Sequence, residues 1–271
     1  MLEVNYKGKF ISYKEIWFCN EISNNSVNLK KIDVATYRFR KSPENPGLFR
    51  KYELSRTLMT DLYEDKEELF KAFRSTLRNE IKRVQKKGIQ AKIYIPSPEN
   101  DINELLVDIE EKFVSMYKSK GMLKKFPRWR VKNYIMHNCV FITYACLDGN
   151  NLVYHIYVSD GKNVQFLISC SDFRNNDLDM QKTIAMANKY LHWYDIVYFK
   201  DNGFEIYDWG GIFSFDEPTG IDKFKMAFGG RAVEHYFETR YISLRGKILK
   251  ILQMFRLSGL YSKVREKVQN G

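Results

Sequence analysis

The chain has 271 residues, of which 44% are hydrophobic and 15% aromatic, a composition typical of a folded globular protein with a substantial core. No run of about 20 apolar residues occurs and the N-terminus lacks a signal-peptide pattern, so we expect a cytoplasmic protein without a membrane-spanning helix. The formal net charge of +11 attracts polyanions, whether nucleic acid, phosphorylated small molecules or an anionic membrane face, without choosing among them.

The first predicted elements are strands and one long helix. Residues 33–40 and 49–60 are rich in β-forming residues, and SPENPG at 42–47 between them is a turn by composition. Apolar residues then recur every three or four positions over 66–87, which predicts a helix. Its expected cap is Asp65, and Gly88 is its expected C-terminal stop.

The middle of the chain predicts a sheet framed by helices. PSPEN at 96–100 follows a short strand at 90–95 and marks the main boundary; a second amphipathic helix is expected over 101–119. KKFPRWR, at 124–130, is interpreted as a basic loop. Three strands joined by Gly-containing hairpin turns and a long helix follow, at 139–147, 152–159, 163–170 and 177–200.

Two glycine pairs frame the most informative segment. A strand over 204–208 is expected to stop at Gly210–Gly211, and a helical turn carrying Lys223 and Lys225 leads to Gly229–Gly230 and another strand. Glycine pairs let a backbone adopt positive φ or approach a ligand closely, although an ordinary strand-loop-helix corner has the same pattern. The whole order predicts an α/β protein, a mixed α+β sheet flanked by helices.

Common catalytic and metal-binding motifs are absent from the sequence. It lacks GxGxxG, the P-loop, the acetyl-CoA loop of ordinary acetyltransferases and a nucleophile elbow. The four cysteines have no CxxC spacing, so we expect reduced cysteines and no metal site. Each of the four histidines is interpreted as a surface or core residue rather than a catalytic base.

Three basic segments have two interpretations each. Arg174 precedes the long helix, where it either helps to hold a phosphate or belongs to a solvated cap. The cluster at 78–92 is either a solvated helix face or a nucleic-acid contact. The amphipathic segment 245–263 either packs on the domain or makes a peripheral contact with an anionic membrane.

The runs RNEIKRVQKKGI (78–89), GFEIYDWGGI (203–212) and TGIDKFKMAFGG (219–230) resemble motifs of the Fem-type aminoacyltransferases. These belong with the lipid II:glycine glycyltransferase group of the GNAT-like acyltransferase superfamily. The overlap covers roughly residues 66–236. The resemblance implies a GNAT-like fold with one complete unit and a truncated N-terminal unit. The corresponding segments are 1–95, a core at 96–240 and a basic tail at 241–271.

The resemblance also implies an enzyme that transfers an acyl or aminoacyl group to an amine. Its donor would be acyl-CoA or an aminoacyl-tRNA, with no permanently bound cofactor. The acceptor would be a nucleotide- or lipid-linked precursor of the cell envelope or of a surface polysaccharide. The alternative is a non-catalytic Fem-like protein whose basic surface binds nucleic acid or an envelope-biosynthesis partner. Either protein would be cytoplasmic, with at most peripheral contact at the inner membrane face.

Residue roles follow from the same motifs. Lys225 carries over as the residue that stabilises the oxyanion or holds substrate, and Asp208 as the residue that orients the amine or acts as base. Substrate binding is predicted for the remaining motif residues and for the cation before the long helix: Tyr207, Trp209, Gly210, Gly211, Phe224 and Arg174.

Overall fold

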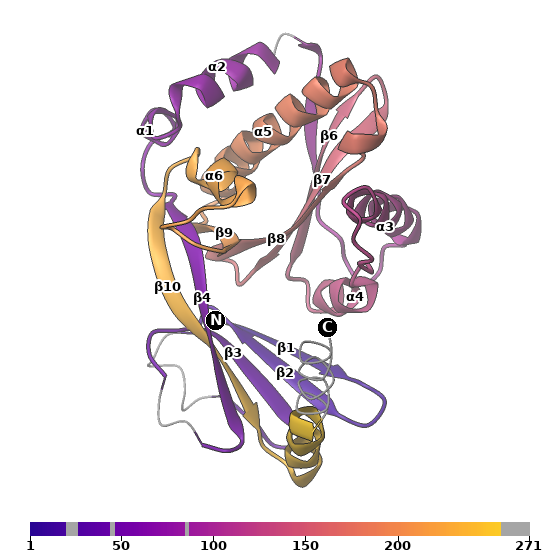
Figure 1. The fold of residues 1–271 in the computed structure, drawn as a ribbon, viewed down its shortest axis with the longest axis vertical. Helices are drawn as coiled ribbons and strands as arrows, with labels where there is room; N and C mark the ends of the chain where they lie inside the picture. Colours follow the sequence, from indigo (N-terminus) through magenta and orange to yellow (C-terminus); the bar gives the residue numbers. More distant parts are fainter. Residues whose placement is uncertain (20–26, 44–46, 85–86, 256–271) are drawn as a thin grey trace, which may run out of the picture. The chain divides into compact units, whose positions relative to one another are not determined.

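The computed structural model describes residues 1–19, 27–43, 47–84 and 87–255. The chain forms two compact units (Figure 1). Unit 1 combines Met1–Ser55 with Glu234–Gly271, and unit 2 is the continuous segment Arg56–Val233. Residues 44–46 of the turn predicted over 42–47 lie outside the described residues, as does the end of the basic segment from 256 onward.

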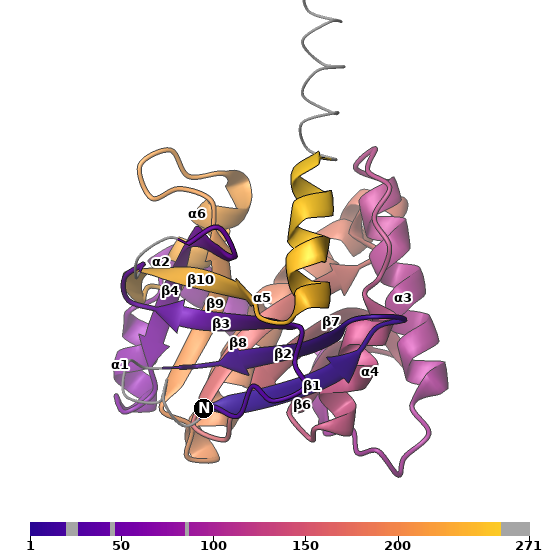
Figure 2. The same cartoon turned by 90° about the horizontal axis from the view of Figure 1, so that it is seen from below.

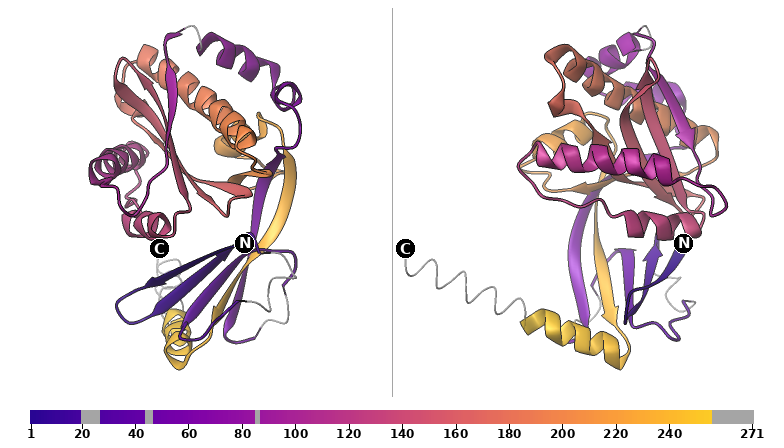
Figure 3. Two further views of the ribbon diagram at one scale, coloured as in Figure 1. Left: turned by 180° about the vertical axis from the view of Figure 1, so that it is seen from behind. Right: turned by 90° about the vertical axis from the view of Figure 1, so that its right-hand side faces the viewer.

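Unit 1 is a small mixed sheet with one helix. Its strands pair in the order β1-β2-β3-β10, parallel between β2 and β3 and antiparallel elsewhere. A helix over residues 244–255 follows the last strand (Figures 2 and 3). The strands are β1 (Leu2–Lys7), β2 (Ser12–Trp17), β3 (Val34–Arg40) and β10 (Arg231–Tyr241).

Unit 2 is a larger sheet with helices on both faces. Its strand order is β4-β9-β8-β7-β6-β5, with β8 and β9 parallel and the other neighbours antiparallel. The strands are β4 (Arg50–Asp61, in unit 2 from Arg56 onward), β5 (Gln90–Tyr94), β6 (Val140–Leu147), β7 (Asn150–Ser159), β8 (Asn163–Ser171) and β9 (Ile206–Ile212).

The helices of unit 2 divide between the two faces of this sheet. One face carries α1 (Lys66–Lys71), α2 (Ser75–Val84), α5 (Leu178–Asp201) and α6 (Gly220–Met226). The other face carries α3 (Asn103–Lys118) and α4 (Arg128–Met136), as Figure 1 shows. A short 3-10 helix, η3 (Phe173–Asn175), precedes α5. The main core lies between α5 and the sheet, where Tyr157, Phe199 and Trp209 are buried. This mixed α/β architecture confirms the predicted fold class.

The structure confirms most of the predicted elements and corrects three. The helix expected over 66–87 is broken into α1 and α2, because the amide of Arg74 donates to the carbonyl of Ala227 (2.9 Å). The segment 124–130 is not all loop, since α4 begins at Arg128. The strand expected to stop at Gly210 continues to Ile212, paired with β4. The break at Arg74 and the continuation of β9 both depend on tertiary contacts that short-range sequence patterns do not encode.

Among the described residues, no helix is both long enough and apolar enough to cross a bilayer.

Candidate functional site

Lys225 lies on α6, a short helix held by its own first turn. Thr219 and Asp222 form a capping box, in which each side chain accepts a hydrogen bond from the other's backbone amide. Asp222 also accepts from the amide of Phe213 (3.0 Å), which ties the preceding loop to the helix. The cap therefore fixes the direction in which the following turn, with Lys225, faces.

The ammonium group of Lys225 is nearly buried. It donates to the carbonyl oxygen of Gly211 (2.8 Å) and lies 5.9 Å from the ring centre of Phe166. Burial lowers the pKa of Lys225 from 10.5 to about 8, although the charges of Asp208 and Asp222 act in the opposite direction. The group is therefore mainly protonated near pH 7.

Asp208 lies inside β9 and is fully buried. Its Oδ1 accepts hydrogen bonds from the hydroxyl of Thr57 and from the amide of Gly210 (2.8 Å). Its Oδ2 has no hydrogen-bond partner among the described residues. Burial raises the pKa of Asp208 to about 6, against the lowering effect of these hydrogen bonds and of Lys225. The carboxylate thus holds the backbone around Gly210 and adds a negative charge beneath the lysine.

Gly210 marks the point where β8 and β9 part. The two strands pair only from Asn163 with Ile206 to Gln165 with Asp208, although both continue further. Gly210 has φ +69°, and a Cβ atom there would lie 2.6 Å from the carbonyl oxygen of Phe166. Glycine is therefore required for the close approach. Gly211, next to it, is exposed and unobstructed.

A basic pocket of about 310 Å³ lies beside α6, and we name it the Arg174 pocket. Phe224 lines it, together with Arg174 from η3, so the structure brings these two predicted residues together. Lys120 adds a further cation, whereas Lys189, which also lines the pocket, is ion-paired with Glu80 (2.6 Å). Such a concave, partly apolar surface with several cations suits a phosphorylated ligand.

The N-terminus of α5 does not supply the anion site that the sequence suggested beside Arg174. The Asp177 side chain already accepts hydrogen bonds from the amides of Asp179 (3.1 Å) and Met180 (2.8 Å). A carboxylate of the chain thus takes the place that a phosphate would need. Any role of Arg174 in binding must come from the pocket wall.

A second basic pocket, of about 350 Å³, lies between α3, α4 and β8, and we name it the Arg130 pocket. Lys124, Lys125 and Arg130 supply cations, and its aromatic walls are Phe113, Tyr117 and Tyr134. Arg130 donates through Nε to the hydroxyl of Tyr134 (2.6 Å), and Lys124 donates to that of Tyr117 (3.0 Å). The sequence prediction missed this pocket; its available signal was the basic and aromatic run KKFPRWR, at 124–130.

Tyr207 and Trp209, predicted to bind substrate, are fully buried in the core. The hydroxyl of Tyr207 lies 2.9 Å from that of Tyr157, and the indole N–H of Trp209 donates to Thr60 (3.0 Å). In this structure both side chains therefore support the strand from within, while Phe224 and Arg174 line open space.

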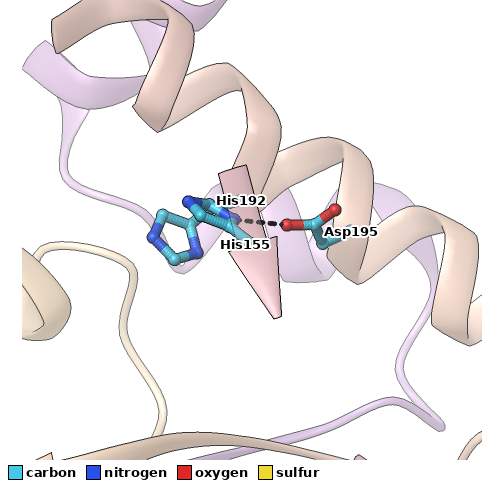
Figure 4. A group of neighbouring side chains, drawn as sticks. All are labelled: His155, His192 and Asp195. Carbon is cyan, nitrogen blue, oxygen red and sulfur yellow. Dashed lines mark hydrogen bonds and ion pairs between the residues drawn. The ribbon is translucent and has the colours of Figure 1, made fainter. Parts of the chain in front are cut away.

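Two of the histidines, His155 and His192, are far apart in the sequence but lie side by side in the buried interior. The rings of His155 and His192 are 4.2 Å apart, and His155 Nδ1 lies 2.8 Å from Asp195 Oδ2 (Figure 4). His155 Nε2 bonds Asn188 of the Arg174 pocket (2.8 Å). His192 Nδ1 lies 3.0 Å from the hydroxyl of Tyr207.

This trio is the group of metal-type ligands found among the described residues, with its ligand atoms within 4.8 Å of one another. Both ring nitrogens of His155 and the Nδ1 of His192 already have hydrogen-bond partners, however. Burial, then the charges of His155 and Lys225, hold the pKa of His192 well below 6.5. An added cation would face the same Lys225 charge. We therefore assign His155, His192 and Asp195 to a buried hydrogen-bonded network.

The fold is that of Fem-type proteins. The structure of FemX superposes with a TM-score of 0.62 at 15% identity, covering 92% of this chain and 85% of FemX. L-PGS from Bacillus licheniformis gives 0.51 at 11% identity, covering 93% and 84%. The C-terminal domain of a putative lysylphosphatidylglycerol synthetase from Agrobacterium fabrum gives 0.50 at 14%, covering 83% and 72%. The likeness to FemX in fold that the motifs implied is thereby confirmed.

No protein-family profile matches the chain, and no curated protein matches it by sequence. The likeness is therefore one of fold, and the activity has to be argued from the residues of the site.

Proposed function

We propose that the chain is an acyl- or aminoacyltransferase. It would transfer an acyl group to the amine of a nucleotide- or lipid-linked precursor of the cell envelope or of a surface polysaccharide. The observation that carries this proposal is the nearly buried ammonium of Lys225, together with a basic pocket lined by its chain neighbour and another lined by the chain neighbours of Phe166. Phe224, its neighbour on α6, lines the Arg174 pocket. Leu167 to Ser169, directly after Phe166 on β8, line the Arg130 pocket.

Acyl transfer to an amine passes through a tetrahedral oxyanion, which a fixed positive charge stabilises. Lys225 suits this role, because its ammonium is nearly dehydrated and held by the carbonyl of Gly211. Asp208 suits a positioning role better than that of a base, since Thr57 and Gly210 occupy its Oδ1 and its whole side chain is buried. The acceptor amine would then lose its proton to solvent or to a phosphate of the substrate.

The two pockets suit the two substrates. Cations beside aromatic rings in the Arg130 pocket fit a base followed by a diphosphate, which is the chemistry of a nucleotide-linked acceptor. The Arg174 pocket would then take the phosphate-bearing part of the donor, acyl-CoA or aminoacyl-tRNA. An aminoacyl donor is supported by the similar synthetase, whose name describes a lysyl group joined to phosphatidylglycerol.

The test compares two lysines of α6, nearly buried Lys225 and exposed Lys223. We expect Lys225→Ala to lower the rate of transfer to a UDP-linked peptide amine by about 10²–10³, as loss of an oxyanion donor does. Lys223→Ala should leave the rate within about twofold. Each variant is assayed with acyl-CoA and with aminoacyl-tRNA, and the donor that supports transfer is the substrate.

Transfer that survives both Lys225→Ala and Asp208→Ala would remove these two residues from the mechanism. Binding of the UDP-linked peptide without transfer from either donor would support a non-catalytic binding protein instead.

A further inference from the structure

The helix over residues 244–255 exposes its apolar side. Leu244, Ile248, Leu252 and Phe255 recur along one helical face and are 74%, 48%, 56% and 69% exposed. A helix of a globular protein normally turns this stripe toward the core. Here the stripe lies on the surface of unit 1, where the helix is visible in Figure 3.

The side that packs against unit 1 has Gly246, Lys250 and Gln253, with Leu249 half-buried beside them. A Cβ at Gly246 would lie 2.2 Å from the carbonyl oxygen of Asp33, so the first turn rests directly on backbone. Further along, Tyr241 donates its hydroxyl to Gln253 (2.9 Å), and the ammonium of Lys250 lies 5.5 Å from the Tyr241 ring centre. These contacts fix which way the helix is rotated, and its apolar side is consequently turned outward.

The charges on the helix itself are all positive, and one acidic residue, Asp33, lies beside its first turn. Between Ser243 and Phe255 the sequence has Arg245, Lys247 and Lys250 and no acidic residue. A depression of about 530 Å³ beside the start of the helix is lined by Lys7 and Lys31 as well as by Arg245. An apolar stripe bordered by exposed cations is the pattern of helices that lie in the interface of an anionic bilayer.

We propose that the helix over 244–255 docks unit 1 onto an anionic lipid surface. In this arrangement the apolar stripe enters the acyl-chain boundary, while the flanking cations meet the phosphates of the headgroups. A second copy of the chain is a poorer occupant, because pairing two such faces would bring cations against cations. This inference goes beyond the proposed function and holds for a catalyst or a binding protein alike.

The experiment is co-sedimentation of the full chain with vesicles of phosphatidylglycerol and phosphatidylcholine, or of phosphatidylcholine alone. We expect binding to the anionic vesicles that weakens as sodium chloride rises. The variant Ile248→Gln/Leu252→Gln should lower the partition coefficient at least about tenfold. The matched control is Leu48→Gln/Leu54→Gln, two similarly exposed leucines of unit 1, and it should bind like the unsubstituted chain.

Three results would overturn the proposal. They are no binding by the intact chain, equal binding to neutral and anionic vesicles, and equal loss in both double variants. Sedimentation equilibrium supplies a further check. If the chain dimerises and Ile248→Gln/Leu252→Gln abolishes the dimer without changing vesicle binding, the face is a contact between copies. Thermal unfolding of both variants establishes that any loss of binding is not a loss of fold.

Discussion

At the residue scale, the candidate site is built from groups that lower the stability of the folded state. Lys225 and Asp208 are both buried, and burial moves both pKa values toward the neutral form. Gly210 is forced into a left-handed conformation at a backbone contact with Phe166. Strained and desolvated groups collected in one place are typical of functional sites.

Replacing Lys225 should therefore stabilise the protein. Its pKa is about 8 when folded and 10.5 when unfolded, so the folded state disfavours the ammonium fully below pH 8, and this penalty disappears as pH rises through 10.5. The difference corresponds to about 3 kcal/mol, of which the lost hydrogen bond to Gly211 takes back about 1. We expect Lys225→Met to raise the free energy of unfolding at pH 7 by about 1–2 kcal/mol in urea titrations.

The gain from Lys225→Met should shrink when unfolding is measured at pH 10. Lys223→Met, on the exposed side of the same helix, should change the free energy of unfolding by less than about 0.5 kcal/mol. A clear destabilisation by Lys225→Met at pH 7 would contradict the desolvation argument.

The two adjacent glycines of β9 should respond differently to a methyl group. Gly210→Ala must place a Cβ 2.6 Å from the carbonyl of Phe166 at φ +69°, so we expect a loss of about 2–4 kcal/mol in stability. Gly211→Ala meets nothing within 4 Å and should cost less than about 1 kcal/mol. Chemical denaturation of both variants measures the difference, and similar losses would show that the contact with Phe166 relaxes freely.

At the element scale, α4 includes the end of the basic run 124–130, which the sequence predicted to be a loop. Because the helix begins at Arg128, Arg130 and Tyr134 stand one turn apart and face the same pocket. Lys132 lies on the same helix but donates instead to Asn103 of α3 (2.9 Å). The helix therefore directs Arg130 into the pocket and Lys132, two residues later, toward α3.

We expect Arg130→Ala to weaken binding of UDP at least about tenfold, since it removes a charge-assisted contact with phosphate. Lys132→Ala should leave the affinity within about twofold. Isothermal titration calorimetry with UDP and with uridine separates a phosphate contact from a contact with the base. Unchanged UDP affinity in Arg130→Ala would mean that the nucleotide binds elsewhere.

Features that depend only on residues nearby in the sequence were predictable from the sequence. Asp65 caps α1 as expected, because an Asx cap needs only the amide three residues later (2.9 Å). The break between α1 and α2 was not predictable, since it follows from a bond between Arg74 and Ala227. The continuation of β9 past Gly210 likewise depends on its pairing with Thr57 and its neighbours on β4.

At the scale of the whole molecule, the net charge of +11 should act on every anionic ligand before any specific contact forms. We expect the affinity for UDP to fall about three- to tenfold when sodium chloride rises from roughly 20 to 200 mM, because salt screens these charges. Uridine, which is neutral, is the matched control and should bind equally well at both concentrations. Equal salt dependence of the two ligands would mean that the field contributes nothing to binding.

The division of the chain into a truncated N-terminal unit (1–95), a core (96–240) and a basic tail (241–271) remains a prediction. In the folded chain, the two ends together form unit 1, and the middle forms unit 2. The two ends meet through the pairing of β3 with β10, whose partner residues are about 200 positions apart. Pairing over such a separation is decided by the register of whole strands, which short-range sequence patterns do not report.

The sequence by itself determined the α/β class, the resemblance to Fem-type proteins and the position of Lys225 in a helical turn that follows the Gly210–Gly211 pair along the chain. These follow from local periodicity and from motifs that are short in sequence. Only the tertiary structure placed His155 beside His192, gathered the Arg130 pocket from α3, α4 and β8, and turned the apolar side of the last described helix outward. Each of these depends on which surfaces meet when the elements pack, and packing joins residues that no local pattern connects.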